Sequence, residues 1–329
     1  MSTTEEVTRK RDRDGDIEPL WFPDGNIVLI AQDAHFRVHR GVLSRNSEIF
    51  RVMFDLPQPS DAAETYISEC PAIPLSDRKS DVDCMLRALY DGQNYYKHDT
   101  ALSFSVVCAL LRLGTKYQIQ HLREEAIRRL GACFPSSLKK FERIIDGPAV
   151  KQGEISCREV EITYEDAITV IDMARNLDVP SLLPPAFVAC TRLPSEQLIR
   201  GVVDGCGDQS YLSKSDLILI VDAQKTLKSE ALRSIGSLLT ISSPRCIKNI
   251  SRGRPCKREK QAILEAIWSG QVAPAIDPFT KLTRPNLPVQ DAMCEPCWEA
   301  FHEQRQKVAR DVWASLGVLF RVPSWKGEN

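Results

Sequence analysis

The sequence has no long apolar run, and no stretch approaches the roughly 18 to 20 residues that a membrane helix needs. Its first nineteen residues, MSTTEEVTRKRDRDGDIEP, lack the apolar core of a secretory signal. Neither sign of charge dominates, because 43 Lys and Arg residues stand against 44 Asp and Glu residues. We therefore expect a cytoplasmic or nuclear protein, or one found in both places, that has no membrane contact and is not a bulk binder of nucleic acid.

Motifs of enzyme sites are also missing. The chain has no phosphate-binding G-x-x-x-x-G-K-[ST], and GVVDGCG at 201–207 lacks the spacing of a dinucleotide loop. The acidic run DRDGD suggests a calcium loop, but counting from Asp12 the sixth position is Ile17 and the twelfth is Pro23. A calcium loop needs glycine and glutamate at those positions. These absences predict a protein that is not an enzyme.

The stretch FRVHRGVLSRNSEIF at 36–50 places a histidine between a strand-like run and a helix. No nucleophile or paired carboxylate falls at a spacing that would make His39 catalytic. We interpret the stretch as a structural motif instead. A histidine can bond a backbone group left unpaired at such a junction, and serine can cap the helix that follows. The motif comprises Phe36, His39, Leu43, Ser47 and Phe50.

Apolar spacing predicts a small sheet followed by packed helices. Strand-like runs at 27–31 and 35–38 are separated by three polar or small residues that suit a hairpin. A helix is expected from Asn46 or Ser47, and YISECPAIPLSD is expected to lie at a sheet edge because of its prolines. A second helix should start at Ser80 and end at Gly92, and a helical hairpin interrupted at Gly114 should follow.

Three segments resemble the BTB/POZ domain, more narrowly the BTB-containing proteins abundant in mushroom-forming fungi. They are WFPDGNIVLIAQDAHFRVHRGVLSRNSEIFRVMF, LSDRKSDVDCMLRALYDG and FSVVCALLRLGTKYQIQHLREEAIRRL, within about residues 20 to 135. The resemblance implies a non-enzymatic protein-interaction module that forms homodimers in some members and recruits substrates to cullin-type ubiquitin ligases in others. The family commonly has an aspartate where this chain has Asn26, and that aspartate helps to organise the dimer face in some members.

These observations predict an α+β module, a small sheet flanked by helices, followed by a mainly α-helical C-terminal region. We expect a disordered tail at 1–19, a BTB/POZ-like domain at 20–145, a linker at 146–163 and the helical region at 164–329. In that last region Ser215 is expected to cap a long helix, and an apolar spacing of four at 308, 312 and 316 predicts another. Its ending resembles regions often attached to fungal BTB domains.

The chain has eleven cysteines, an odd number, and without a secretory signal this favours thiols or metal ligands over a disulfide framework. Near the C-terminus, Cys294 and Cys297 form C-E-P-C, and Cys246 and Cys256 lie upstream. Four such thiolates suit a tetrahedral structural zinc site, with His302 as a substitute ligand. Plain thiols are the alternative. A redox-active C-x-x-C is a third interpretation, although no strand–helix pattern surrounds it.

Residues 243–260 hold seven Lys or Arg and one acid, Glu259, which suits phosphate contacts, a nuclear import signal or simply a solvated loop. The leading functional hypothesis is an adaptor or scaffold that binds proteins, self-associates or recruits substrates to a cullin-type ligase. The alternative is a nuclear transcription or chromatin regulator that uses the basic segment or a zinc-bearing tail.

Overall fold

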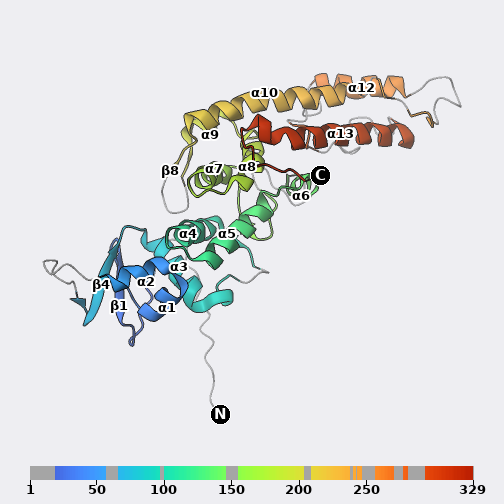
Figure 1. Cartoon of the computed structure of the whole chain (residues 1–329). Helices are drawn as coiled ribbons and strands as arrows, with labels where there is room; N and C mark the ends of the chain where they lie inside the picture. Colours follow the sequence, from blue (N-terminus) through green and yellow to red (C-terminus); the bar gives the residue numbers. More distant parts are fainter. Residues whose placement is uncertain are drawn as a thin grey trace, which may run out of the picture. The chain divides into compact units, whose positions relative to one another are not determined.

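The structure is a computed structural model, and it describes part of the chain (Figure 1). The described residues are 19–56, 66–96, 100–145, 155–203, 209–237, 240–241, 243–246, 256–269, 277–280 and 293–328. The predicted tail at 1–19 lies almost wholly outside them, as does the first half of the predicted linker at 146–163. The chain forms two compact units: residues 1–96 with 113–123, and residues 97–112 with 124–329. The division passes through two helices, and the predicted domain boundary at residue 145 stays a prediction.

The first unit is built on a four-stranded sheet with helices beside it (Figure 1). Its strands are β1 (Ile27–Ala31), β2 (Ala34–Val38), β3 (Tyr66–Ile67) and β4 (Cys70–Leu75). Its helices are α1 (Arg40–Asn46), α2 (Glu48–Asp55), α3 (Lys79–Asp91) and the 3-10 turn η1 (Gly92–Asn94). The sheet order is β2-β1-β4-β3, with β1 antiparallel to β2 and parallel to β4.

Three local expectations in this unit need correction. The hairpin between β1 and β2 is one residue tighter than predicted, because Gln32 takes a left-handed backbone with φ 56°. The segment YISECPAIPLSD lies at the sheet edge only through β3, because β4 stands between β3 and β1: it pairs with β3 through its first two residues and with β1 through its last four. Helix α3 begins at Lys79 without a side-chain cap, so Ser80 lies inside it.

Two helices cross from one unit to the other: α4 (Phe104–Lys116) and α5 (Gln120–Cys133). Gly114 does not break the hairpin as predicted but lies within α4. A Cβ atom there would stand 2.8 Å from the backbone nitrogen of Arg123, so glycine permits close packing of the two helices. The chain reverses at Gln118, whose φ is 52°.

The second unit is mainly helical, and its elements follow in chain order. They are β5 (Leu102–Ser103), α6 (Leu138–Ile145), β6 (Val160–Glu161), α7 (Asp166–Asn176), η2 (Pro180–Leu182), α8 (Leu183–Cys190), α9 (Ser195–Arg200), β7 (Val202–Val203), β8 (Gln209–Ser210), α10 (Lys214–Gly236), α12 (Lys257–Trp268) and α13 (Glu295–Leu319). The predicted fold class, an α+β module followed by a helical region, is confirmed. The cap of α10 is Ser213 rather than Ser215, because the Ser213 hydroxyl accepts the N–H of Asp216 at 3.0 Å.

Aromatic side chains form a core in this unit. The rings of Phe141, Phe279 and Trp313 contact one another, with centroids 4.9 to 6.1 Å apart, and all three are buried. The short described segment 277–280 is anchored there, because Asp277 forms a buried ion pair with Arg192 at 2.6 Å. Among the described residues, no helix combines the length and apolar character needed to cross a membrane.

Candidate functional site

The structural motif at the junction of β2, α1 and α2 is densely packed. Phe36, Leu43 and Phe50 are fully buried, because β2 and both helices turn these side chains inward. The Phe50 ring stacks on Tyr117 with centroids 4.4 Å apart and an interplanar angle of 11°. These contacts fit a role in holding the fold, which is the role the sequence predicted for them.

Ser47 is the polar centre of this junction. Its hydroxyl oxygen accepts the N–H of Phe50 at 3.0 Å and so caps α2. The same hydroxyl donates to the carbonyl of Tyr117 at 2.6 Å, which satisfies a buried backbone group. Serine thus supplies one acceptor and one donor where both are required.

His39 meets side chains rather than the backbone group that we expected. Its Nδ1 lies 3.0 Å from Tyr90 Oη, and its Nε2 lies 3.3 Å from Asp24 Oδ2. The backbone N–H of His39 also donates to Tyr90 Oη, at 2.8 Å. The hydrogen bond from His39 lowers the pKa of the exposed Asp24 carboxyl. The histidine therefore joins the end of β2 to α3 through a tyrosine that no sequence pattern singled out.

Asn26 stands where the resemblance led us to expect an aspartate. Its side-chain oxygen accepts the N–H of Arg40 at 2.8 Å, in the first turn of α1. This bond needs only an acceptor, so an amide oxygen makes it as well as a carboxylate would.

The structure brings Cys246, Cys256, Cys294 and Cys297 together. Their four sulfur atoms all lie within 4.8 Å of one another, and we call this group the cysteine cluster. Cys246 Sγ is 3.8 Å from Cys256 Sγ and 3.7 Å from Cys294 Sγ. Three of the side chains are buried, and Cys294 is partly exposed.

Local structure explains why these cysteines converge. Cys256 directly precedes α12, and Cys294 is the N-cap residue of α13, with Pro296 in the first turn. Two helix N-termini, each the positive end of a helix dipole, therefore lie at the cysteine cluster. The backbone N–H of Cys294 also donates to Cys256 Sγ, at 3.4 Å.

An apolar layer surrounds the cysteine cluster. It contains buried side chains from three helices that lie near one another in Figure 1. They are Ala231 and Ile235 of α10, Ile263 and Leu264 of α12, and Met293 and Phe301 at α13, with Trp298 partly buried against them. This layer keeps water from most of the cluster, as in structural metal sites that have no open position.

The geometry fits a single tetrahedral ion. Four thiolates at a zinc–sulfur distance of about 2.3 Å have sulfurs about 3.8 Å apart, from the geometry of a tetrahedron. Two sulfur separations in the cluster, Cys246–Cys294 at 3.7 Å and Cys246–Cys256 at 3.8 Å, match this value. An iron–sulfur cluster of several irons would hold its cysteines farther apart, because they bind different metal atoms.

Three thiols of the cysteine cluster have pKa values that are shifted in different directions. Burial raises the pKa of Cys297 and of Cys256. Burial alone would also raise that of Cys246, but hydrogen bonds from the Cys256 backbone and from neighbouring thiols outweigh it and lower the pKa. Cys246 therefore loses its proton before Cys256 and Cys297 do.

Two further expectations concern this region. His302 packs its ring against Trp298, with centroids 4.6 Å apart, and is not a member of the four-sulfur group. The C-E-P-C pair opens a helix, α13, but among the described residues no strand follows β8, so no strand–helix pattern surrounds the pair. A second observation argues against a redox-active pair. Cys246 and Cys256 lie close to Cys294 and Cys297, whereas a dithiol site needs only two sulfurs.

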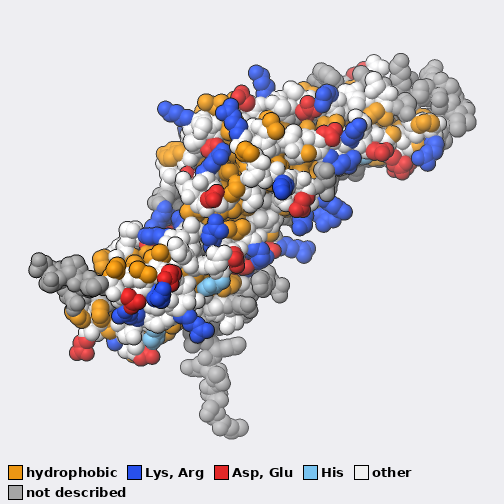
Figure 2. Space-filling view, in the orientation of Figure 1, with side chains coloured by type: hydrophobic (Ala, Val, Ile, Leu, Met, Phe, Trp, Pro, Cys, Tyr) orange, Lys and Arg blue, Asp and Glu red, His pale blue; other side chains and the backbone are white. Residues whose placement is uncertain are grey.

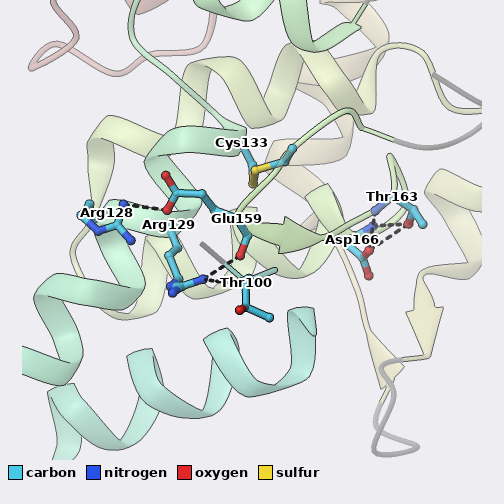
Figure 3. The surroundings of a disulfide bond; sticks show 8 residues. Thr100, Arg128, Arg129, Cys133, Glu159, Thr163 and Asp166 are labelled. Atoms are coloured by element: carbon cyan, nitrogen blue, oxygen red, sulfur yellow. Dashed lines mark hydrogen bonds and ion pairs between the residues drawn. A yellow bond between two sulfur atoms is a disulfide. The ribbon is translucent and has the colours of Figure 1, made fainter. Parts of the chain in front are cut away.

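One cysteine pair departs from the expectation of thiols or metal ligands. Cys133 at the end of α5 forms a disulfide with Cys157, with Cα atoms 5.4 Å apart (Figure 3). Beside it, the buried Arg129 donates to the carbonyls of Thr100 and Glu159 at 3.1 and 2.8 Å. These bonds and the disulfide hold the segment that carries β6, which pairs with β5. Sequence spacing alone did not reveal this proximity, because 24 residues separate the two cysteines.

Comparison with known families identifies the N-terminal part of the chain. Residues 25–131 match the model of the BTB/POZ domain. A search among curated proteins finds no match to the chain. The BTB/POZ domain is a protein–protein interaction module of a non-enzymatic family, and such domains often dimerise. The chain therefore carries an interaction domain of this type, from just before β1 to within α5.

Proposed function

We propose that this protein is a non-enzymatic adaptor or scaffold that acts through its BTB/POZ domain and self-associates. The observation that carries the proposal is the match of residues 25–131, together with the dense packing of the junction around Ser47, which leaves its polar groups occupied by structure. Recruitment of substrates to a cullin-type ubiquitin ligase is the more specific role that we propose. The helices that follow the domain leave room for a second contact with such a ligase.

The outer face of α2 offers a place to test self-association. Val52 on α2 and Leu56, the residue that caps the C-terminal end of α2, are 46% and 60% exposed. The double variant Val52→Asp, Leu56→Asp adds charge there and alters no buried side chain. If this face joins two copies, the variant elutes as a monomer while its melting temperature changes little.

The experiment is affinity purification of the full chain with partner identification, combined with size-exclusion chromatography and light scattering. Recovery of a cullin supports the ligase role, and recovery of the chain alone as a dimer supports a self-associating scaffold. A strictly monomeric chain that captures no protein contradicts the proposal.

A second candidate function is a nuclear regulator that contacts DNA. It is favoured by one observation: Cys246 and Cys256, both in the cysteine cluster, enclose a run with Lys248, Arg252 and Arg254 and no acid. That run lies outside the described residues, and on the face drawn in Figure 2 the coloured Lys and Arg side chains are interspersed with Asp and Glu. Binding to DNA that weakens steeply as salt rises supports this candidate. Binding that is absent at low salt contradicts it.

We also propose that the cysteine cluster holds one structural Zn²⁺. Four thiolates in a closed apolar setting are a donor set that zinc accepts without an open position. The test is elemental analysis of protein purified under reducing conditions, together with alkylation of the folded chain. One zinc per chain and four protected thiols support the site. If the analysis finds one iron per chain, the site holds a different tetrahedral ion. Absence of metal, with all four thiols reactive, contradicts any metal site.

A further inference from the structure

The cysteine cluster has one accessible member. Cys246, Cys256 and Cys297 are each 1 to 3% exposed, whereas Cys294 is only partly buried at the start of α13. A small oxidant therefore reaches the cluster first at Cys294. Oxidation of a cysteine sulfur begins with exposure and thiolate character, and a ligand thiolate has the latter.

One sulfur at contact distance from this entry point is on another chain segment. Cys294 Sγ lies 3.7 Å from Cys246 Sγ, and a disulfide requires an approach to about 2.05 Å. The remaining two cysteines, Cys256 and Cys297, lie within 4.8 Å of each other as well. Both pairs are thus placed so that a modest movement of side chains forms a bond.

We infer that the cysteine cluster is a zinc clasp that peroxide opens, and that the first bond formed joins Cys246 to Cys294. This inference rests on the proposed zinc site. Hydrogen peroxide oxidises Cys294 to a sulfenic acid, and the Cys246 thiolate attacks that sulfur with loss of water. The same two steps then occur at the second pair of cysteines. In the overall reaction, one Zn²⁺ bound by four thiolates, two H₂O₂ and four H⁺ give free Zn²⁺, two disulfides and four H₂O.

Opening the clasp changes the helical end of the chain. The ion joins the segment after α10 to the first residues of α12 and α13, so its release removes a link among three segments. Two disulfides join the four cysteines only in pairs and with a different geometry, so they do not restore the same link. Loss of zinc therefore couples the oxidant to the arrangement of these helices, and a thiol reductant with added zinc reverses it.

The test treats the reduced, zinc-loaded full chain with hydrogen peroxide, follows zinc release with a chromogenic chelator and maps disulfides by mass spectrometry. We expect one zinc released per two peroxides consumed, Cys246–Cys294 as the earliest disulfide, and recovery of the zinc site after reduction. Cys84→Ser is the matched control, because among the described cysteines Cys84 is the other partly exposed thiol, and it lies on α3 outside the cluster. Its release rate should equal that of the unaltered chain.

The outcomes separate the inference from the proposal beneath it. A reduced chain that contains no zinc overturns the metal site itself. Zinc that is present but stays bound in excess peroxide overturns the clasp alone. Release with oxidation only at cysteines outside the cluster also overturns the clasp, as does an earliest disulfide other than Cys246–Cys294.

Discussion

The junction around Ser47 and the cysteine cluster are held in different ways. At the junction, protein groups satisfy one another: Ser47 bonds the backbone of Phe50 and Tyr117, and His39 bonds Tyr90 and Asp24. At the cluster, four thiols converge in an apolar layer and form a set of ligands. The junction is complete in its own chemistry, whereas the proposed arrangement of the cluster includes an ion.

This difference explains why the two regions should respond to different changes. Side-chain truncation at the junction removes packing or a single hydrogen bond, which costs a few kcal/mol at most. Loss of a metal ligand removes the binding energy of the ion, about 10 to 16 kcal/mol in small zinc peptides. The predictions below are ordered by that expected size.

The largest effect is expected from Cys256→Ser with Cys297→Ser. Two buried ligands are lost, so the variant should contain no stoichiometric zinc and should become sensitive to protease between residues 243 and 328. Metal analysis and limited proteolysis measure these outcomes, with Cys84→Ser as the control that keeps both properties. Zinc content and protease resistance equal to those of the unaltered chain would contradict the cluster's role.

Phe50→Ala should cost about 3 to 5 kcal/mol of unfolding free energy in the first unit, because it opens a cavity beside Tyr117. Chemical denaturation followed by tyrosine and tryptophan fluorescence measures it. Val52→Ala, on the exposed face of the same helix, should change stability by no more than about 0.5 kcal/mol. Equal effects of the two variants would show that the junction is not a packed core.

Ser47→Ala should lower stability by about 1 kcal/mol, within a range of about 0.5 to 2, because α2 loses its cap. The lost bond to the Tyr117 carbonyl places the effect toward the upper end of that range. Thermal denaturation measures it against Ser44→Ala, since Ser44 lies on α1 and caps no helix. A melting temperature unchanged from that of the unaltered chain would refute the capping role.

His39→Ala should have the smallest effect of these variants. It should lower the free energy of unfolding by about 1 kcal/mol, which is seen as a lower melting temperature. The backbone N–H of His39 keeps its bond to Tyr90 Oη, so only the ring contacts are lost. Tyr90→Phe, which removes the hydroxyl that serves both bonds, should have the greater effect. The reverse order of the two variants would contradict this account of the histidine.

Sequence patterns predicted the module well because its signals are local. The two strand-like runs, the cap at Ser47 and the stop at Gly92 depend on neighbours within a few residues, and the structure has each of them. The errors arose where a distant segment decides the outcome. Gly114 reflects the approach of Arg123, and β4 is interior because it pairs on both sides.

The candidate site shows the same limit. The four cysteines were chosen from a C-x-x-C and two loosely spaced neighbours, and the structure brings them together, although α12 after Cys256 was not predicted. The partners of His39 were missed, since Tyr90 is 51 residues away. The disulfide of Cys133 and Cys157 was missed because closure of that loop depends on β6 pairing with β5.

Hydrogen exchange measured by mass spectrometry, with and without a zinc chelator, tests the difference between the two regions most directly. Under reducing conditions the account predicts that chelation removes protection from the C-terminal part of α10 and from α12 and the start of α13. Protection of β1, β2 and α2 should stay unchanged. Equal protection in both regions before and after chelation, or equal loss in both, would contradict the claim that only the cysteine end depends on a metal.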